Sequence, residues 1–108
     1  MDNLKEIIRV LSNNKNILRE RYKVKKIGLF GSCVKGKLKK RSDIDIVVEF
    51  DINAFGENFK GLYDTFLNLH TYLEHLLNRK VDILTPISIE TIRIKEVAED
   101  IKRNIIYV

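Results

Sequence analysis

The sequence lacks tryptophan and glutamine and contains only one cysteine, one proline and one methionine among its 108 residues. A single cysteine cannot form a disulfide within the chain, and with only two histidines beside it there is no convincing set of zinc ligands. No apolar run approaches the ~20 residues that a membrane-spanning helix needs. Asp2, Lys5 and Glu6 stand where a secretory signal would be apolar, so we expect a cytoplasmic protein without a membrane anchor.

The length is sufficient for one domain, because a second hydrophobic core would need about 50 further residues. Hydrophobic residues make up 44% of the chain and charged residues 32%, which excludes both a disordered tail and a membrane protein. The single proline and the five glycines are spaced as turn residues, and no stretch has the composition of a linker. We therefore expect residues 1–108 to fold as a single domain.

Positive charge is concentrated in one part of the chain. Residues 15–41 contain eleven lysines and arginines against one acid, Glu20, and carry a net charge of +10, whereas the other 81 residues carry −5. Such a segment attracts polyanions, which include nucleic acid, the triphosphate of a nucleotide and an acidic partner protein. The charge alone does not choose among them, and a solvated surface would have the same composition.

The hydrophobic pattern predicts several short helices and strands. Helices are expected at residues 4–11, at 17–22, from Phe59 to Asn78, and after Ser88, which can cap the last helix. Strands are expected at residues 25–30, 44–50 and 81–84, with one or two helical turns at 32–36 and an apolar tail at 105–108. This order predicts an α/β or α+β fold in which a small mixed sheet is covered mainly on one face by helices.

Three aspartates lie in or beside the predicted strands. Asp43 and Asp45 are two residues apart, so they project from the same strand face while the apolar residues between and after them face the core. Paired carboxylates repel each other unless a cation lies between them, and Mg²⁺ prefers carboxylate, phosphate and water oxygens. Asp82 would join the pair if its strand neighbours that of Asp45. Three carboxylates could then hold two metal ions for phosphoryl or nucleotidyl transfer.

A second motif, Gly31-Ser32, stands where the first strand turns into a short helix. Glycine allows a ligand to approach the backbone, and a helix N-terminus offers free N–H groups to a phosphate. Ser32 adds a hydroxyl donor, and Lys35 is the first of several basic residues that place positive charge nearby. Each motif is weak by itself, because Asp43 could merely cap a turn and Asp45 could be a solvated strand residue.

The two motifs together resemble those of the DNA polymerase beta-like nucleotidyltransferase superfamily. The matching residues are Phe30-Gly31-Ser32, the ten residues from Cys33 to Ser42, Asp43-Ile44-Asp45 and Val81-Asp82-Ile83-Leu84. They span much of the chain and most resemble the minimal nucleotidyltransferases, known as MNT proteins. The resemblance implies the nucleotidyltransferase fold and assigns nucleotide phosphate binding to Gly31 and Ser32, with Lys35 close by. It assigns Mg²⁺ binding to Asp43 and Asp45, while Asp82 completes the metal site or activates the attacking hydroxyl.

Minimal members of this superfamily are commonly encoded beside HEPN-family proteins. They act as antitoxins that transfer AMP from ATP to a tyrosine of the HEPN toxin. The resemblance therefore implies an ATP- and Mg²⁺-dependent protein adenylyltransferase, with a HEPN-type toxin as partner, weak or indirect contact with nucleic acid, and a homo-oligomer or a hetero-oligomer with the toxin as possible assemblies.

Two other functions remain as alternatives. In one, the protein is a non-catalytic module whose basic segment binds RNA or a toxin. The carboxylates distinguish this module from an enzyme, because RNA binding does not need them and they would repel phosphate without a metal. The other alternative, transfer to a small molecule, is disfavoured because a chain of this length has no second domain in which to build an acceptor pocket.

Two further kinds of residue are expected to be structural. A lone cytosolic cysteine is more often inert packing than a reactive thiol, which is how we interpret Cys33. His70 shares a helical row with Tyr63 and Leu77, which indicates a position at the edge of the core.

Overall fold

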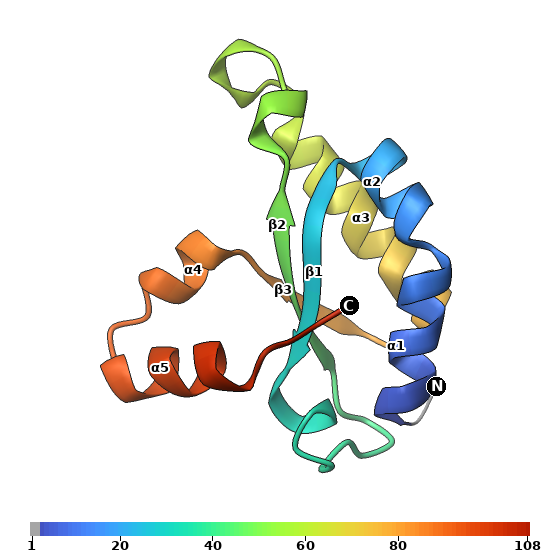
Figure 1. Ribbon diagram of the computed structural model, residues 1–108, viewed down its shortest axis with the longest axis vertical. Coiled ribbons are helices and arrows are strands. Elements are labelled where there is room, and N and C mark those ends of the chain that lie inside the picture. Colours follow the sequence, from blue (N-terminus) through green and yellow to red (C-terminus); the bar gives the residue numbers. More distant parts are fainter. Residues whose placement is uncertain (1–2) are drawn as a thin grey trace.

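A four-stranded mixed sheet forms the centre of the protein, whose computed structural model describes residues 3–108 (Figure 1). Its strands are β1 (Val24–Phe30), β2 (Ile44–Phe50), β3 (Val81–Leu84) and β4 (Ile106–Tyr107), in the order β3-β2-β1-β4. Strand β1 runs antiparallel to both β2 and β4, whereas β2 and β3 are parallel. The mixed sheet confirms the predicted fold class.

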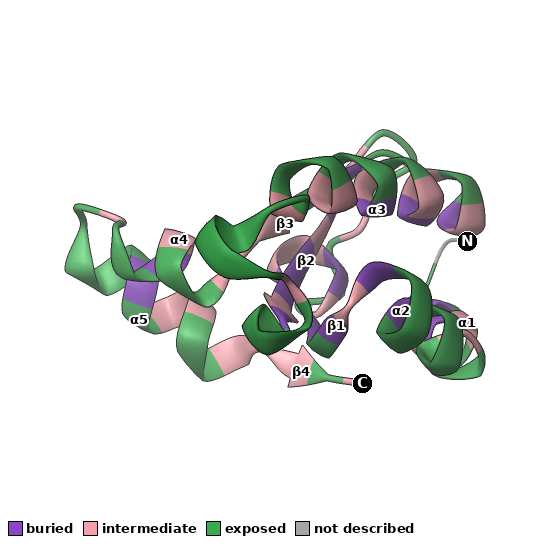
Figure 2. Cartoon of the chain, turned by 90° about the horizontal axis from the view of Figure 1, so that it is seen from above, coloured by how far each residue is buried: buried purple, intermediate pink, exposed green. Residues whose placement is uncertain are grey.

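The helices lie on both faces of the sheet but are unequally distributed (Figures 1 and 2). One face carries α1 (Leu4–Asn13), α2 (Lys15–Tyr22) and α3 (Leu62–Leu77), and the other carries the shorter α4 (Pro86–Glu90) together with α5 (Lys95–Asn104). The larger core lies under the first group, and a second cluster of four buried residues lies under the other, namely Phe30, Val47, Ile89 and Ala98. The sheet is therefore covered mainly on one face, as the sequence predicts.

Alternation along β2 separates the core from the site. Ile44, Ile46 and Val48 are fully buried in the larger core. Asp45 and Glu49 face the other way and are only half-buried. Because successive side chains of a strand point to opposite faces, one segment supplies both the apolar core and a polar surface.

The prediction that Ser88 caps the last helix is wrong. Ser88 lies inside α4, whose N-cap is Thr85, and the backbone N–H of Ser88 donates to the Thr85 side-chain oxygen at 3.2 Å. Pro86 occupies the first turn of α4, where its missing N–H costs nothing. The last helix, α5, begins at Lys95.

The long helix begins three residues later than predicted. Asn58, Phe59 and Gly61 all have positive φ angles, of 61°, 54° and 84°, and this left-handed backbone interrupts the apolar periodicity that continues into the helix. Helix α3 therefore starts at Leu62 and ends at Leu77, as expected, before Asn78. The segment before it forms short 3-10 turns at Ile52–Ala54 and Glu57–Phe59.

The apolar tail at residues 105–108 becomes a strand. In β4, Ile106 pairs with Leu29 and Tyr107 pairs with Gly28. A Cβ atom on Gly28 would lie 2.8 Å from the side chain of Ile105, so glycine allows the tail to pack against β1. Within residues 3–108, no helix has the length and apolar character needed to cross a membrane.

Candidate functional site

Strand pairing brings the predicted site residues to one end of the sheet. In the parallel pair β2–β3, Asp45 lies opposite Asp82, and in the antiparallel pair β1–β2 the same Asp45 lies opposite Phe30. Gly31 follows Phe30 directly and begins a short 3-10 turn at Gly31–Cys33. Asp45 is therefore flanked by the Gly-Ser turn on one side and by Asp82 on the other.

The three carboxylates influence one another electrostatically. The pKa of Asp45 is raised, first because its carboxyl is partly buried and then because the charges of Asp82 and Asp43 disfavour its ionised form. Asp43 is half-buried and lies directly before β2, outside the strand whose face it is predicted to share with Asp45, and Asp82 is exposed on β3, a strand at the edge of the sheet. The group therefore concentrates negative charge at a place that is open to solvent.

Gly31 approaches the Asp45 carboxylate so closely that no side chain fits between them. A Cβ atom at position 31 would overlap Oδ2 of Asp45 and lie 3.1 Å from its Cγ. The φ angle of Gly31 is +72°, in the left-handed region that favours glycine. Only glycine therefore satisfies both the backbone conformation and the contact with Asp45.

The turn after Gly31 is held by its own backbone. The carbonyl of Gly31 accepts hydrogen bonds from the N–H groups of Val34 and Lys35, at 3.2 and 3.1 Å, and the carbonyl of Ser32 accepts one from Lys37 at 2.8 Å. Ser32 is half-buried, and its hydroxyl has no partner within residues 3–108. The predicted hydrogen bond from this hydroxyl to a nucleotide phosphate stays a prediction.

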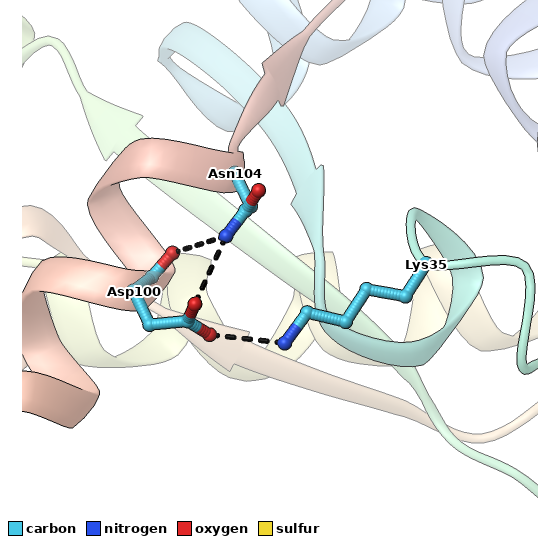
Figure 3. Close-up of polar contacts among 3 residues, drawn as sticks. All are labelled: Lys35, Asp100 and Asn104. Carbon is cyan, nitrogen blue, oxygen red and sulfur yellow. Dashed lines mark hydrogen bonds and ion pairs between the residues drawn. The ribbon is translucent and has the colours of Figure 1, made fainter.

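Lys35 contacts α5 (Figure 3). Its ammonium group lies 3.0 Å from a carboxylate oxygen of Asp100, whose other carboxylate oxygen accepts a hydrogen bond from the Asn104 side chain at 3.1 Å. The hydrogen bond from Lys35 lowers the pKa of Asp100. The predicted proximity of Lys35 to a nucleotide phosphate stays a prediction. To contact a phosphate, the Lys35 ammonium group would have to leave Asp100.

The donor atoms suit a hard divalent cation. Asp43, Asp45 and Asp82 offer only oxygen ligands, and the pKa of Asp45 is raised first by burial and then by the charges of Asp82 and Asp43, which a cation would offset. Within the described residues, no group of three or more His, Cys, Asp or Glu side chains is arranged to hold a metal ion. These residues therefore fit Mg²⁺ bound by one or two carboxylates, with phosphate and water oxygens as its remaining ligands. Binding of two ions by all three carboxylates stays a prediction.

Two residues that the sequence indicates as structural have structural contacts. Cys33 is buried, its thiol donates to the carbonyl of Phe30 at 3.5 Å, and its pKa is raised by burial and then by the charge of Asp45. A raised pKa leaves little of the reactive thiolate. Nε2 of His70 lies 3.0 Å from the carbonyl oxygen of Val81, so this side chain connects α3 to β3.

Two other residues near the site could not be found from the sequence. Asp100 pairs with Lys35 across 65 residues of chain, and Arg79 donates to the carbonyls of Ser42 and Lys39 across 37 and 40 residues. Neither residue belongs to a local motif. The only signal for Arg79 is its place just before the strand that carries Asp82.

Gly31→Ala should disable the site, whereas Gly36→Ala should not. Both glycines have positive φ angles, +72° and +70°, but a Cβ at position 36 has no atom within 4 Å. Gly36→Ala should therefore cost only backbone strain of about 1–2 kcal/mol, while Gly31→Ala must also displace Asp45. We expect calorimetry with Mg²⁺ and a nonhydrolysable ATP analogue to show binding by Gly36→Ala and none by Gly31→Ala. Equal affinities would contradict the role of Gly31.

Asp45→Asn should stabilise the metal-free protein at neutral pH. Because the folded state raises the pKa of Asp45, the unfolded chain releases this proton first as pH rises, and stability falls between the unfolded pKa and the higher folded one. This loss of folding stability persists at neutral pH, and it is absent at pH values below the pKa of Asp45 in the unfolded chain.

Thermal unfolding in a chelator from about pH 4 to 8 measures the effect. The variant should melt a few degrees above wild type at neutral pH, and the difference should shrink toward pH 4. Glu49→Gln, on the same strand face, is the control. A variant that melts below wild type at neutral pH would contradict a raised pKa of Asp45 in the folded protein.

The comparisons with known proteins agree with this geometry. Residues 11–108 match the family described as nucleotidyltransferase domain. A Methanocaldococcus jannaschii protein provisionally named a protein adenylyltransferase is 42% identical over 108 residues, which is 100% of both chains. The protein adenylyltransferase MntA of Thermococcus cleftensis is 38% identical over 105 residues, which is 97% of this chain and 95% of that protein.

Two solved structures share the fold. One, provisionally identified as a minimal nucleotidyltransferase, has a TM-score of 0.65 and 25% identity and covers 94% of this chain and 92% of its own. The other is a toxin-antitoxin crystal structure with AMP-PNP, with a TM-score of 0.56 and 22% identity. The match covers 95% of this chain and 69% of that chain. Because the matched region includes the Gly31 turn and all three carboxylates, and because relatives align over the whole chain, this protein belongs to the minimal nucleotidyltransferase family and is a nucleotidyltransferase.

Proposed function

We propose that the protein transfers AMP from ATP, with Mg²⁺, to a hydroxyl group of a partner protein, and that the partner is a HEPN-type toxin modified on a tyrosine. The observation that carries the proposal is the position of Asp45 between the Gly31 turn and Asp82. The names of the relatives, which are protein adenylyltransferases, support AMP as the transferred group. A similar fold in a toxin-antitoxin structure with AMP-PNP supports both an ATP-like substrate and a toxin partner.

The residues on the two sides of Asp45 have different parts in this reaction. The Gly31 backbone allows the triphosphate to approach, and the Ser32 hydroxyl donates a hydrogen bond to it. Asp43 and Asp45 hold the cation. Bound Mg²⁺ would neutralise the phosphate charge that develops during transfer. The hollow of about 450 Å³ beside Asp43 is also lined by basic residues, namely Lys40, Arg41, Arg79 and Lys80, which favour an anionic substrate.

Asp82 has the position of the general base. It lies on an edge strand and is exposed, so a hydroxyl from outside the domain can reach it. The hydroxyl oxygen attacks the α-phosphorus, its proton passes to Asp82, and the bond to pyrophosphate breaks. We propose that another protein supplies the acceptor hydroxyl.

The basic segment includes a second cluster that the reaction does not use. Lys15, Arg19, Lys25 and Lys26 line an open hollow of about 350 Å³ between α2 and the start of β1, the end opposite to Gly31. This cluster favours the alternative in which the protein binds its partner through charge, without catalysis. The two functions make opposite predictions for variants of Asp82 and of the basic cluster.

Asp43→Asn should abolish transfer, because it removes one charged ligand from the cation site. We expect a loss of ~10²-fold or more in the labelling of the partner from radiolabelled ATP. Asp64→Asn is a matched control, since Asp64 is an exposed residue in the first turn of α3 and lies outside the carboxylate group. Full activity of Asp43→Asn would rule out the assignment of this residue to the metal.

Asp82→Asn should separate binding from chemistry. ATP affinity, which depends on the Gly31 turn and on Asp43 and Asp45, should remain within a few-fold of wild type, while transfer falls by ~10²-fold or more. Coexpression with the toxin decides between the functions. If neutralisation survives Asp82→Asn without AMP on the partner, and is lost in the charge reversals Lys15→Glu and Arg19→Glu, the protein acts by charge alone.

A further inference from the structure

We propose that Arg79 is a positioning residue that holds the loop before β2 and thereby places Asp43 for the cation. The inference deepens the proposed function, on which it rests for the role of Asp43. Arg79 lies in the short connection between α3 and β3.

The guanidinium of Arg79 joins two points of the loop. Nη1 donates to the carbonyl oxygen of Ser42 at 2.9 Å, and Nη2 donates to that of Lys39 at 2.8 Å. Arginine suits this task because its planar group presents two N–H donors in a fixed geometry and stays charged at any physiological pH. Hydrogen bonds from a charged donor are also stronger than those between neutral groups.

Leu38 packs against the larger core, but the residues of the loop after it have little else to hold them. Residues 39–41 are two lysines and an arginine, all exposed, so no buried apolar side chain fixes this stretch. The N–H of Ser42 donates to the carbonyl of Lys39, and the N–H of Lys39 donates to the Ser42 hydroxyl, both at 3.0 Å. Arg79 therefore closes a small turn whose three like charges repel one another, and it acts through its two hydrogen bonds, because its own positive charge adds to that repulsion.

Asp43 is held between two consecutive residues of the α3–β3 connection. On one side, Arg79 binds the carbonyl of Ser42, and on the other, the N–H of Ile44 donates to the carbonyl of Lys80 at 3.0 Å. The same connection continues into β3, which carries Asp82. One segment thus fixes the position of Asp43 relative to Asp82. The Arg79 side chain supplies the contact on the Ser42 side of Asp43.

Arg79 could instead act only as one more positive charge near the phosphates. Lys80 separates these roles, because it lines the same hollow beside Asp43 and carries the same charge, yet within residues 3–108 its side chain makes no hydrogen bond or ion pair. Lys80→Met and Arg79→Met each remove one charge, but only the second removes the two hydrogen bonds. Arg79→Lys keeps the charge and cannot bridge both carbonyls in the same way.

Limited digestion with trypsin measures the order of the loop directly, since Lys39, Lys40 and Arg41 are its own cleavage sites. Mass spectrometry would follow cleavage after these residues in the four proteins under native conditions. We expect Arg79→Met to be cut there about tenfold faster than wild type, in line with the loss of two charge-assisted hydrogen bonds. Arg79→Lys should be intermediate, and Lys80→Met should match wild type.

Binding of Mn²⁺ in the presence of a nonhydrolysable ATP analogue, followed by electron paramagnetic resonance, tests the consequence for Asp43. Arg79→Met should bind Mn²⁺ about tenfold more weakly than Lys80→Met, which removes one charge from the same hollow and so measures the electrostatic share of any loss. Circular dichroism would check the fold, and Arg79→Lys carries the comparison if Arg79→Met does not fold.

Each outcome has a distinct meaning. Equal Mn²⁺ affinity of Arg79→Met and Lys80→Met would overturn the positioning role, and so would equal cleavage of their loops. If wild type itself binds no Mn²⁺ with the analogue, the proposed function fails, whereas the digestion still reports whether Arg79 holds the loop.

Discussion

Repulsion among three carboxylates is the constraint around which this end of the sheet is organised. The parallel register of β2 and β3 places Asp45 beside Asp82, and the start of β2 adds Asp43. Burial alone would oppose ionisation of Asp45, and the neighbouring charges oppose it further. The fold tolerates this cost because the larger core, on the other face of the same strand, is fully apolar. The site therefore stores unfavourable electrostatic energy that a divalent cation can relieve.

The remaining polar contacts of the site act on the loop between the Gly-Ser turn and Asp43. Lys35 ties the beginning of that loop to α5, and Arg79 ties its end to the α3–β3 connection. The two contacts differ in strength, because the Lys35–Asp100 pair is half-exposed and screened by solvent, whereas Arg79 is partly buried and binds two carbonyls. We expect the Lys35 end of the loop to move more easily than the end beside Asp43.

Much of this arrangement could be predicted from the sequence because its signals are local. The strands at 44–50 and 81–84 have the predicted limits, whereas Asp43, which is predicted to share a strand face with Asp45, lies just before β2. The start of α3 could not be predicted, since left-handed residues interrupt a pattern whose apolar spacing continues. The strand at the C-terminal tail and the Arg79 contacts depend on residues that are distant in the chain. No local pattern encodes such pairings.

The alternation of β2 also limits how the chain can vary in length. A strand has a period of two residues, so the deletion or insertion of one residue within β2 would turn every following side chain to the opposite face. A deletion between Asp43 and Asp45 would direct one carboxylate into the apolar core. Side chains in the exposed loop before β2 do not alternate between two faces, because the residues of this loop do not pair with another strand. Changes in length should therefore be tolerated in that loop as long as both carbonyls still reach Arg79, and excluded from the seven residues of β2.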